Sequence, residues 1–198
     1  TDALTAPVFL DEADALADRM RSLSPEQLAA IMKISPDLAA LNYDRYQTYR
    51  PKHTQSECIA LFSFAGDAYK SLEAPSLPQE AILLAQKHLG ILSGLYGLLR
   101  PLDAIQMYRL EMGRKPFPPA TLYQYWRSKL SSYLASHIEA QKLHYHLNLA
   151  SQEYAEAIDQ SSLPVPTISP NFLVAKDGQS PKVVGIMAKR ARGAFVRY

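Results

Sequence analysis

The sequence has a single cysteine, no long apolar run and no recognisable secretion signal. Cys58 cannot form a disulfide within the chain, and a lone thiol is typical of proteins from reducing compartments. No stretch approaches the roughly 18 apolar residues that a membrane-spanning helix requires. Residues 1–4 have neither the basic start nor the apolar segment of a signal peptide. These absences predict a cytoplasmic protein that does not cross a membrane.

The sequence also lacks the short motifs of common active sites. It contains no G-x-S-x-G nucleophile elbow, no Walker loop and no cysteine–histidine signature. His144 and His146 would share one face of a strand, but no third residue with metal-ligand spacing accompanies them. We therefore expect no metal site and no cofactor. Cys58 lies in an apolar run, where a small buried thiol is expected.

The composition is that of a folded globular protein. Of 198 residues, 47% are hydrophobic and 20% are charged, which is enough apolar material for one domain over residues 1–198. Periodicity and capping signals predict helices over 10–23, 24–32, 35–43, 65–69, 79–92 and 121–140, and strands over 60–64, 143–149, 166–174 and 183–187. The order shows no regular βαβ alternation. The expected fold class is α+β, a single compact domain of irregular topology with a small mixed sheet.

Positive charge is concentrated at one end of the sequence. The formal net charge is only +2, yet residues 182–198 contain five basic residues and no acidic one. The other 16 basic residues are outnumbered by 19 acidic ones. Such concentration favours an anionic partner, nucleic acid or phosphate. An ordinary solvated surface segment is the alternative that charge alone leaves open.

A glycine-bracketed motif follows the helix predicted over 79–92. Gly94 and Gly97 enclose Leu95 and Tyr96, and glycine permits positive φ and close backbone approach. In a helix-hairpin-helix such a turn presents backbone N–H groups to a DNA phosphate, and Arg100 would add a charge-assisted contact. A structural hairpin without a ligand is the alternative, because the usual signature places its glycines one residue apart. The residues predicted to bind DNA are Gly94, Leu95, Tyr96, Gly97, Arg100, Lys189, Arg190 and Arg192.

Five blocks of sequence together resemble the bacterial YaaA family of peroxide-stress proteins. The blocks are Phe64–Tyr69, Leu92–Asp103, Tyr108–Gly113, Asn148–Tyr154 and Ala188–Gly193. The resemblance extends from about Leu23 to Tyr198. It implies a cytoplasmic protein of the hydrogen-peroxide response, linked to lower free iron and less oxidative DNA damage. It further implies a mixed α/β unit with a helix-hairpin-helix and a positive cleft that binds duplex DNA.

The sequence departs from the family pattern at both ends. Members of the family start with a short apolar strand that runs into Ser-Pro-Ala-Lys-Thr, and they continue beyond the Lys-Arg-Ala-Arg-Gly block into a further helix and tail. Neither segment is present here. A site that uses the missing lysine or the tail is therefore expected to be incomplete. The expected partner is double-stranded DNA, and a monomer is favoured.

An enzyme is the alternative function, because the blocks that carry the resemblance are rich in polar residues. A catalytic pocket would be built from Asp67, Tyr108, Arg109, Glu111, Ser151, Glu153 and Lys189. Scattered carboxylates are more often caps or ion pairs, but active sites do assemble from distant segments. The sequence fixes neither a reaction nor a substrate for such a pocket.

Overall fold

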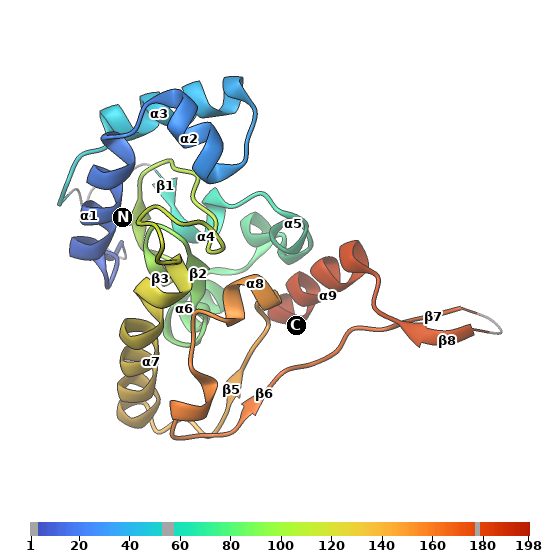
Figure 1. Ribbon diagram of the computed structural model, residues 1–198. Coiled ribbons are helices and arrows are strands. Elements are labelled where there is room, and N and C mark those ends of the chain that lie inside the picture. Colours follow the sequence, from blue (N-terminus) through green and yellow to red (C-terminus); the bar gives the residue numbers. More distant parts are fainter. Residues whose placement is uncertain (1–3, 53–57, 177–178) are drawn as a thin grey trace.

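Residues 4–52, 58–176 and 179–198 are described by the computed structural model of the chain (Figure 1). Helices predominate, and the strands of this described part form four separate two-stranded pairs. The predicted α+β class is therefore confirmed. None of the described helices is both long and apolar enough to span a membrane.

Three helices build the N-terminal part, α1 (Leu10–Arg21), α2 (Pro25–Met32) and α3 (Pro36–Thr48). The predicted capping box starts α2: the Ser24 hydroxyl accepts a hydrogen bond from the Gln27 backbone, and the Gln27 side chain accepts one from the Ser24 backbone. These bonds satisfy two N–H groups that a helix start leaves without partners. Helix α3 continues five residues beyond its predicted end at Tyr43.

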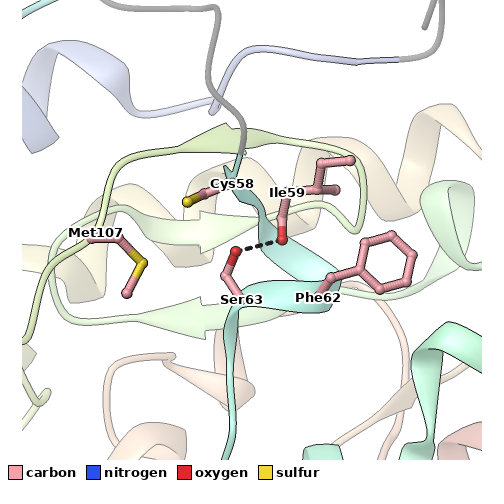
Figure 2. A pocket seen from close by; sticks show the side chains of 5 residues that line it. All are labelled: Cys58, Ile59, Phe62, Ser63 and Met107. Carbon is pink, nitrogen blue, oxygen red and sulfur yellow. Dashed lines mark hydrogen bonds between the residues drawn. The ribbon is translucent and has the colours of Figure 1, made fainter.

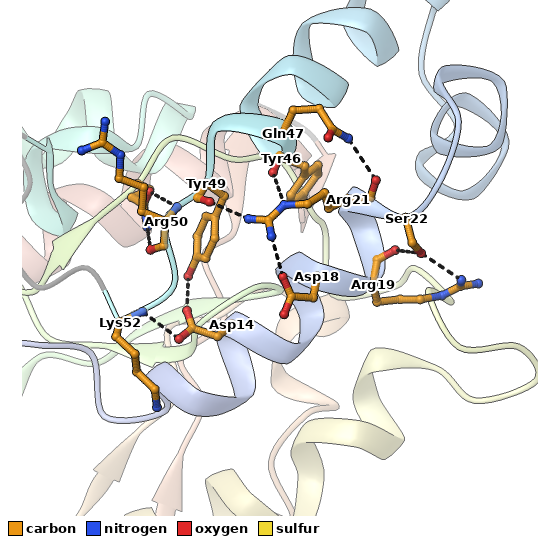
Figure 3. Close-up of polar contacts among 11 residues, drawn as sticks. Asp14, Asp18, Arg19, Arg21, Ser22, Tyr46, Gln47, Tyr49, Arg50 and Lys52 are labelled. Carbon is orange, nitrogen blue, oxygen red and sulfur yellow. Dashed lines mark hydrogen bonds and ion pairs between the residues drawn. The ribbon is translucent and has the colours of Figure 1, made fainter.

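Polar side chains of α1 hold the end of α3 (Figure 3). The Arg21 guanidinium donates to the carbonyl oxygens of Tyr46 and Tyr49, at 2.9 and 2.5 Å, and so caps the C-terminus of α3. Asp14 accepts hydrogen bonds from the Tyr49 hydroxyl and the Lys52 backbone N–H, both at 2.9 Å. This junction fixes the path by which the chain leaves α3.

The segment predicted as a strand over 60–64 is helical. Strand β1 (Cys58–Ile59) pairs antiparallel with β4 (Ala104–Ile105), and the chain then enters the short helix α4 (Ala60–Ser63). An apolar run of five residues fits a buried strand or a buried helical turn equally well, so its length did not decide between them. Helix α5 (Asp67–Leu72) agrees with the helix predicted at 65–69, and the 3₁₀ turn η1 (Ala74–Ser76) follows it.

A β-hairpin replaces the predicted helix-hairpin-helix. Helix α6 (Gln79–His88) ends four residues before its predicted end, and β2 (Ile91–Ser93) then pairs antiparallel with β3 (Gly97–Leu99). The glycine-bracketed motif is the turn of this hairpin, with Gly97 at φ +68°. The 19-residue helix α7 (Leu122–Ala140) lies as predicted. Its Trp126 is fully buried and donates from Nε1 to the Gly94 carbonyl at 2.9 Å.

The C-terminal part contains short strands and one long helix. Strand β5 (His146–Leu147) pairs in parallel with β6 (Thr167–Ile168), with α8 (Gln152–Ala155) and η2 (Gln160–Ser162) between them. Strands β7 (Val174–Lys176) and β8 (Gln179–Lys182) form a projecting hairpin (Figure 1).

The strand predicted over 183–187 is wrong, because helix α9 (Gly185–Arg197) begins within it. Packing explains the outcome, since α9 lies directly against α5 (Figure 1). An apolar run of five residues did not predict that contact between distant segments.

Candidate functional site

The glycine-bracketed turn lies in the core and not on the surface. Leu95 is 0% exposed and Tyr96 is 1% exposed. A Cβ at Gly94 would lie 2.1 Å from the Leu110 carbonyl oxygen, and one at Gly97 would lie 2.6 Å from the Trp126 ring. Close packing against these neighbours therefore requires glycine at both positions. This placement offers no surface on which the turn could present its N–H groups to DNA.

Arg100 is committed to a structural contact. Its guanidinium donates to Asp103 Oδ1 at 3.0 and 3.2 Å and to the Ala6 carbonyl at 2.8 Å. Asp103 is fully buried, and its second carboxylate oxygen accepts from the Arg100 backbone N–H at 2.7 Å. A buried charge such as that of Asp103 needs a partner of opposite sign, and Arg100 supplies it.

The basic face of the molecule is on α9. Lys189 and Arg190 are exposed and Arg192 is half-buried, and α9 contains no acidic residue. We call these three residues the α9 basic face. The described structure shows no hydrogen bond or ion pair for their side chains. Arg197 differs, because its guanidinium donates to the Leu72 and Glu73 carbonyls at 2.9 and 3.2 Å.

A close helix–helix contact holds the α9 basic face in place. A Cβ at Gly193 would lie 1.8 Å from the Ala68 carbonyl oxygen, so the α9 backbone touches the α5 backbone at this point. Gly193 is buried, and α5 also carries the exposed Lys70. Its partner in α5 is distant in sequence, so no local pattern marks Gly193 as a packing residue.

Three residues of the enzyme hypothesis, Arg109, Glu111 and Glu153, do come together. Glu111 accepts from Arg109 Nε at 2.8 Å and from Arg114 Nε at 3.3 Å. Glu153 accepts from the Gly113 backbone N–H at 3.1 Å. We call Arg109, Glu111 and Glu153 the Glu111 cluster. Its carboxylates already hold partners, as structural ion pairs do.

Tyr108 precedes Arg109 in the chain, but its contacts are with the core. Its hydroxyl is 2.5 Å from that of the buried Ser93, and burial raises its pKa well above the usual value. Burial and the charges of Glu153 and Glu111 raise the pKa of nearby Tyr154 to about 12. Both phenols are therefore neutral at physiological pH.

The remaining enzyme candidates lie apart from that cluster. Asp67 is the first residue of α5, Ser151 precedes α8, and Lys189 projects from α9. Within the described residues, their side chains form no hydrogen bond or ion pair with the Glu111 cluster. The proposed seven-residue pocket is therefore only partly assembled.

A cavity of about 350 Å³ lies elsewhere, between α4 and the segment after β4 (Figure 2). It is lined by Cys58, Ile59, Phe62, Ser63 and Met107. Phe62 and Met107 are exposed and Cys58 is half-buried, so the thiol is less enclosed than the sequence predicted. None of the predicted site residues lines it. In the described ranges no three His, Cys, Asp or Glu side chains are grouped to hold a metal ion.

Comparison with known proteins places the chain in a family. A family model described as "Peroxide stress protein YaaA" matches residues 1–198. A UPF0246 protein of Dinoroseobacter shibae is 46% identical over 197 residues, which cover 98% of this chain and 73% of the relative. A UPF0246 protein of Alteromonas mediterranea is 43% identical over 197 residues, covering 98% and 76%. One of Ruegeria pomeroyi is 46% identical over 200 residues, covering 99% and 77%.

Proposed function

The chain belongs to the peroxide stress protein YaaA family, and we propose that it binds duplex DNA largely independently of sequence. In this proposal it acts in the cytoplasm and helps to limit iron-dependent oxidative damage to that DNA. The observation that carries the proposal is the acid-free helix α9 with its exposed basic face. Lysine and arginine side chains on a fixed surface bind phosphates without reading bases.

The surroundings of α9 support this reading. Helix α5 also carries the exposed Lys70, while the Arg197 guanidinium is held by the Leu72 and Glu73 carbonyls at the end of α5. Phe195 is 47% exposed on α9, and its ring lies 6.0 Å from that of Phe172. An exposed aromatic ring stacks on bases of single strands, so Phe195 is not counted among the proposed duplex contacts. We therefore propose that side chains of α9, and not the β2–β3 turn, contact the DNA.

Fluorescence anisotropy with two labelled duplexes of unrelated sequence tests the proposal. We expect similar affinity for both duplexes, in the range of about 10⁻⁴ to 10⁻⁶ M at physiological salt. The logarithm of the binding constant should fall linearly with the logarithm of the salt concentration, with a slope of about −0.9 per neutralised phosphate. An affinity that does not change with salt concentration, or a dissociation constant weaker than about 10⁻⁴ M, would refute DNA binding.

A matched pair of variants assigns the binding to α9. Lys189→Gln combined with Arg190→Gln should weaken binding and make the salt slope shallower by about 1.8, because two phosphate contacts are lost. The control is Lys87→Gln combined with Arg50→Gln, which removes two exposed cations from elsewhere on the surface. Equal loss in both variants would show that general charge, and not α9, carries the binding.

The protective part of the proposal has its own assay. Supercoiled plasmid is exposed to ferrous iron and hydrogen peroxide with and without the protein, and nicking is followed on gels. We expect less nicking with the wild-type protein than with the α9 double variant. Equal nicking with and without wild-type protein would overturn protection while leaving DNA binding intact.

An enzyme remains the second candidate, favoured by the convergence of Arg109, Glu111 and Glu153. A thermal-shift screen with small anionic metabolites would test it. Support would be a stabilising compound whose effect disappears in Glu111→Gln while the variant remains folded. Lack of any stabilising compound would count against this candidate.

A further inference from the structure

Tyr49 and Asp14 form a buried phenol–carboxylate pair at the junction of α1 and α3 (Figure 3). The Tyr49 hydroxyl donates to Asp14 Oδ1 at 2.9 Å, and the two residues are 4% and 7% exposed. Of the tyrosine hydroxyl bonds that the described residues show, this is the one that ends on a carboxylate. A carboxylate within hydrogen-bond distance can act as a proton acceptor.

Further tyrosines connect this pair to the opposite side of the core. Tyr96 is tied to the same part of the chain as Tyr49: its hydroxyl accepts from the Gln106 backbone N–H, and the Gln106 side chain bonds both backbone groups of Arg50, the residue after Tyr49. The Tyr96 ring lies 5.4 Å from the Tyr108 ring, edge to face. Tyr154 and Tyr69 lie near enough to Tyr108 to contribute to the raised pKa of its hydroxyl. We call the five residues the tyrosine series.

The two ends of the tyrosine series differ in exposure. Tyr69 and Tyr154 are half-buried, on α5 and α8, whereas Tyr96 and Tyr49 are buried. Along the series, Tyr108 has the Ser93 hydroxyl as its partner and Tyr96 accepts from the Gln106 backbone N–H at 3.0 Å. Neither partner is a base. Within the tyrosine series, the Tyr49 hydroxyl alone has a carboxylate partner, Asp14, that can accept its proton.

We propose that the tyrosine series carries a one-electron oxidising equivalent from the surface to Tyr49, whose proton then passes to Asp14. The oxidant is a radical of the kind that hydrogen peroxide generates. It takes one electron from Tyr69 or Tyr154 and becomes an anion. The electron vacancy moves through Tyr108 and Tyr96 to Tyr49. There the O–H bond breaks, and the products are a neutral tyrosyl radical and the protonated carboxyl group of Asp14.

Each step transfers one electron, and the single proton moves from Tyr49 Oη to Asp14 Oδ1, so charge and atoms balance. A neutral radical remains in the core and its proton is on Asp14, whose Oδ1 lies 2.9 Å from Tyr49 Oη in the hydrogen bond before oxidation. The series would thus take up oxidising equivalents at the surface and store them where DNA cannot reach. This activity does not require DNA binding.

A flash-quench experiment tests the proposal on the full chain without DNA. A ruthenium photo-oxidant in solution oxidises the protein, and electron paramagnetic resonance follows the tyrosyl radical. We expect a persistent radical in wild type, and a lifetime at least about tenfold shorter in Asp14→Asn, where the proton acceptor is lost. Tyr49→Phe and Tyr96→Phe should lack the persistent signal, whereas Tyr145→Phe, at a 65% exposed tyrosine outside the series, should keep it.

A second measurement uses wild type alone and does not depend on any variant folding. Formation of the radical should be slower in D₂O, because the proton leaves with the electron. An unchanged lifetime in folded Asp14→Asn, or no isotope effect in wild type, would overturn the proposal. So would loss of the radical in Tyr145→Phe. Because no DNA is present, these outcomes are independent of the proposed DNA binding.

Discussion

The contact between Gly193 and Ala68 allows a sharp test of how α9 is held. In Gly193→Ala the new Cβ would lie 1.8 Å from a backbone carbonyl oxygen, which cannot rotate away as a side chain would. Either α9 must move off α5 or the backbone must distort. Overpacking of this kind costs about 1–3 kcal/mol, and contact with backbone falls at the upper end of that range.

Helix propensity opposes this cost. Alanine is better than glycine inside a helix by about 1 kcal/mol. The net destabilisation is therefore about 2 kcal/mol, taking the upper overpacking cost. For a chain of this size, about 2 kcal/mol corresponds to a fall in melting temperature of about 4–8 °C.

Gly185→Ala is the matched control in the same helix. Nothing lies within 4 Å of a Cβ built at Gly185, so only the propensity effect applies and the melting temperature should stay equal or rise. Calorimetry measures both variants, and hydrogen exchange of the α9 amides detects undocking that leaves the rest folded. If Gly193→Ala melts like wild type and its α9 amides exchange no faster, the close contact does not hold α9.

Three further predictions follow from buried contacts. Gly97→Val should lower the melting temperature, because a β-branched residue at φ +68° would also meet Trp126; the strain alone costs about 1–3 kcal/mol, and a calorimetric scan equal to wild type would contradict this. Arg100→Ala should lower the free energy of unfolding in urea by about 1–3 kcal/mol, because buried Asp103 loses its cation. This range is reduced because the Arg100 guanidinium is one-third exposed. A decrease below about 0.5 kcal/mol, as at an ordinary surface residue, would refute the prediction. Burial raises the pKa of the Tyr46, Tyr49 and Tyr108 hydroxyls in the folded state, so above pH 10 only the unfolded chain loses these phenolic protons. The free energy of unfolding should therefore fall by about 1.4 kcal/mol per pH unit for each buried tyrosine. Phenolate absorbance that appears before the protein unfolds would contradict this.

Local chemistry predicted the helices that carry their own start signals. Ser24 and Gln27 form the bonds expected of a capping box, and α7 follows the apolar periodicity around Trp126. Such elements are determined by residues within a few positions of each other. Their existence was therefore readable from the sequence, although the end of α3 was not.

The wrong assignments share one physical cause. Residues 60–64 and 183–187 are short apolar runs, and in the folded chain α4 and α9 begin within them. For such runs the secondary structure depends on the partner, and the partner is distant in sequence. Gly193 shows the same limit, because its importance lies entirely in a carbonyl oxygen of α5.

The structure also changes the physical basis expected for DNA binding. A turn of the helix-hairpin-helix kind binds phosphate through backbone N–H groups, which carry no net charge. Here Gly94 and Gly97 serve packing between segments, and the accessible groups are the cationic side chains of Lys189 and Arg190. Binding through full charges releases counterions and depends steeply on salt, whereas binding through neutral amides does not. The salt slope therefore distinguishes the two modes directly, and a substitution at Gly97 should change stability without changing that slope.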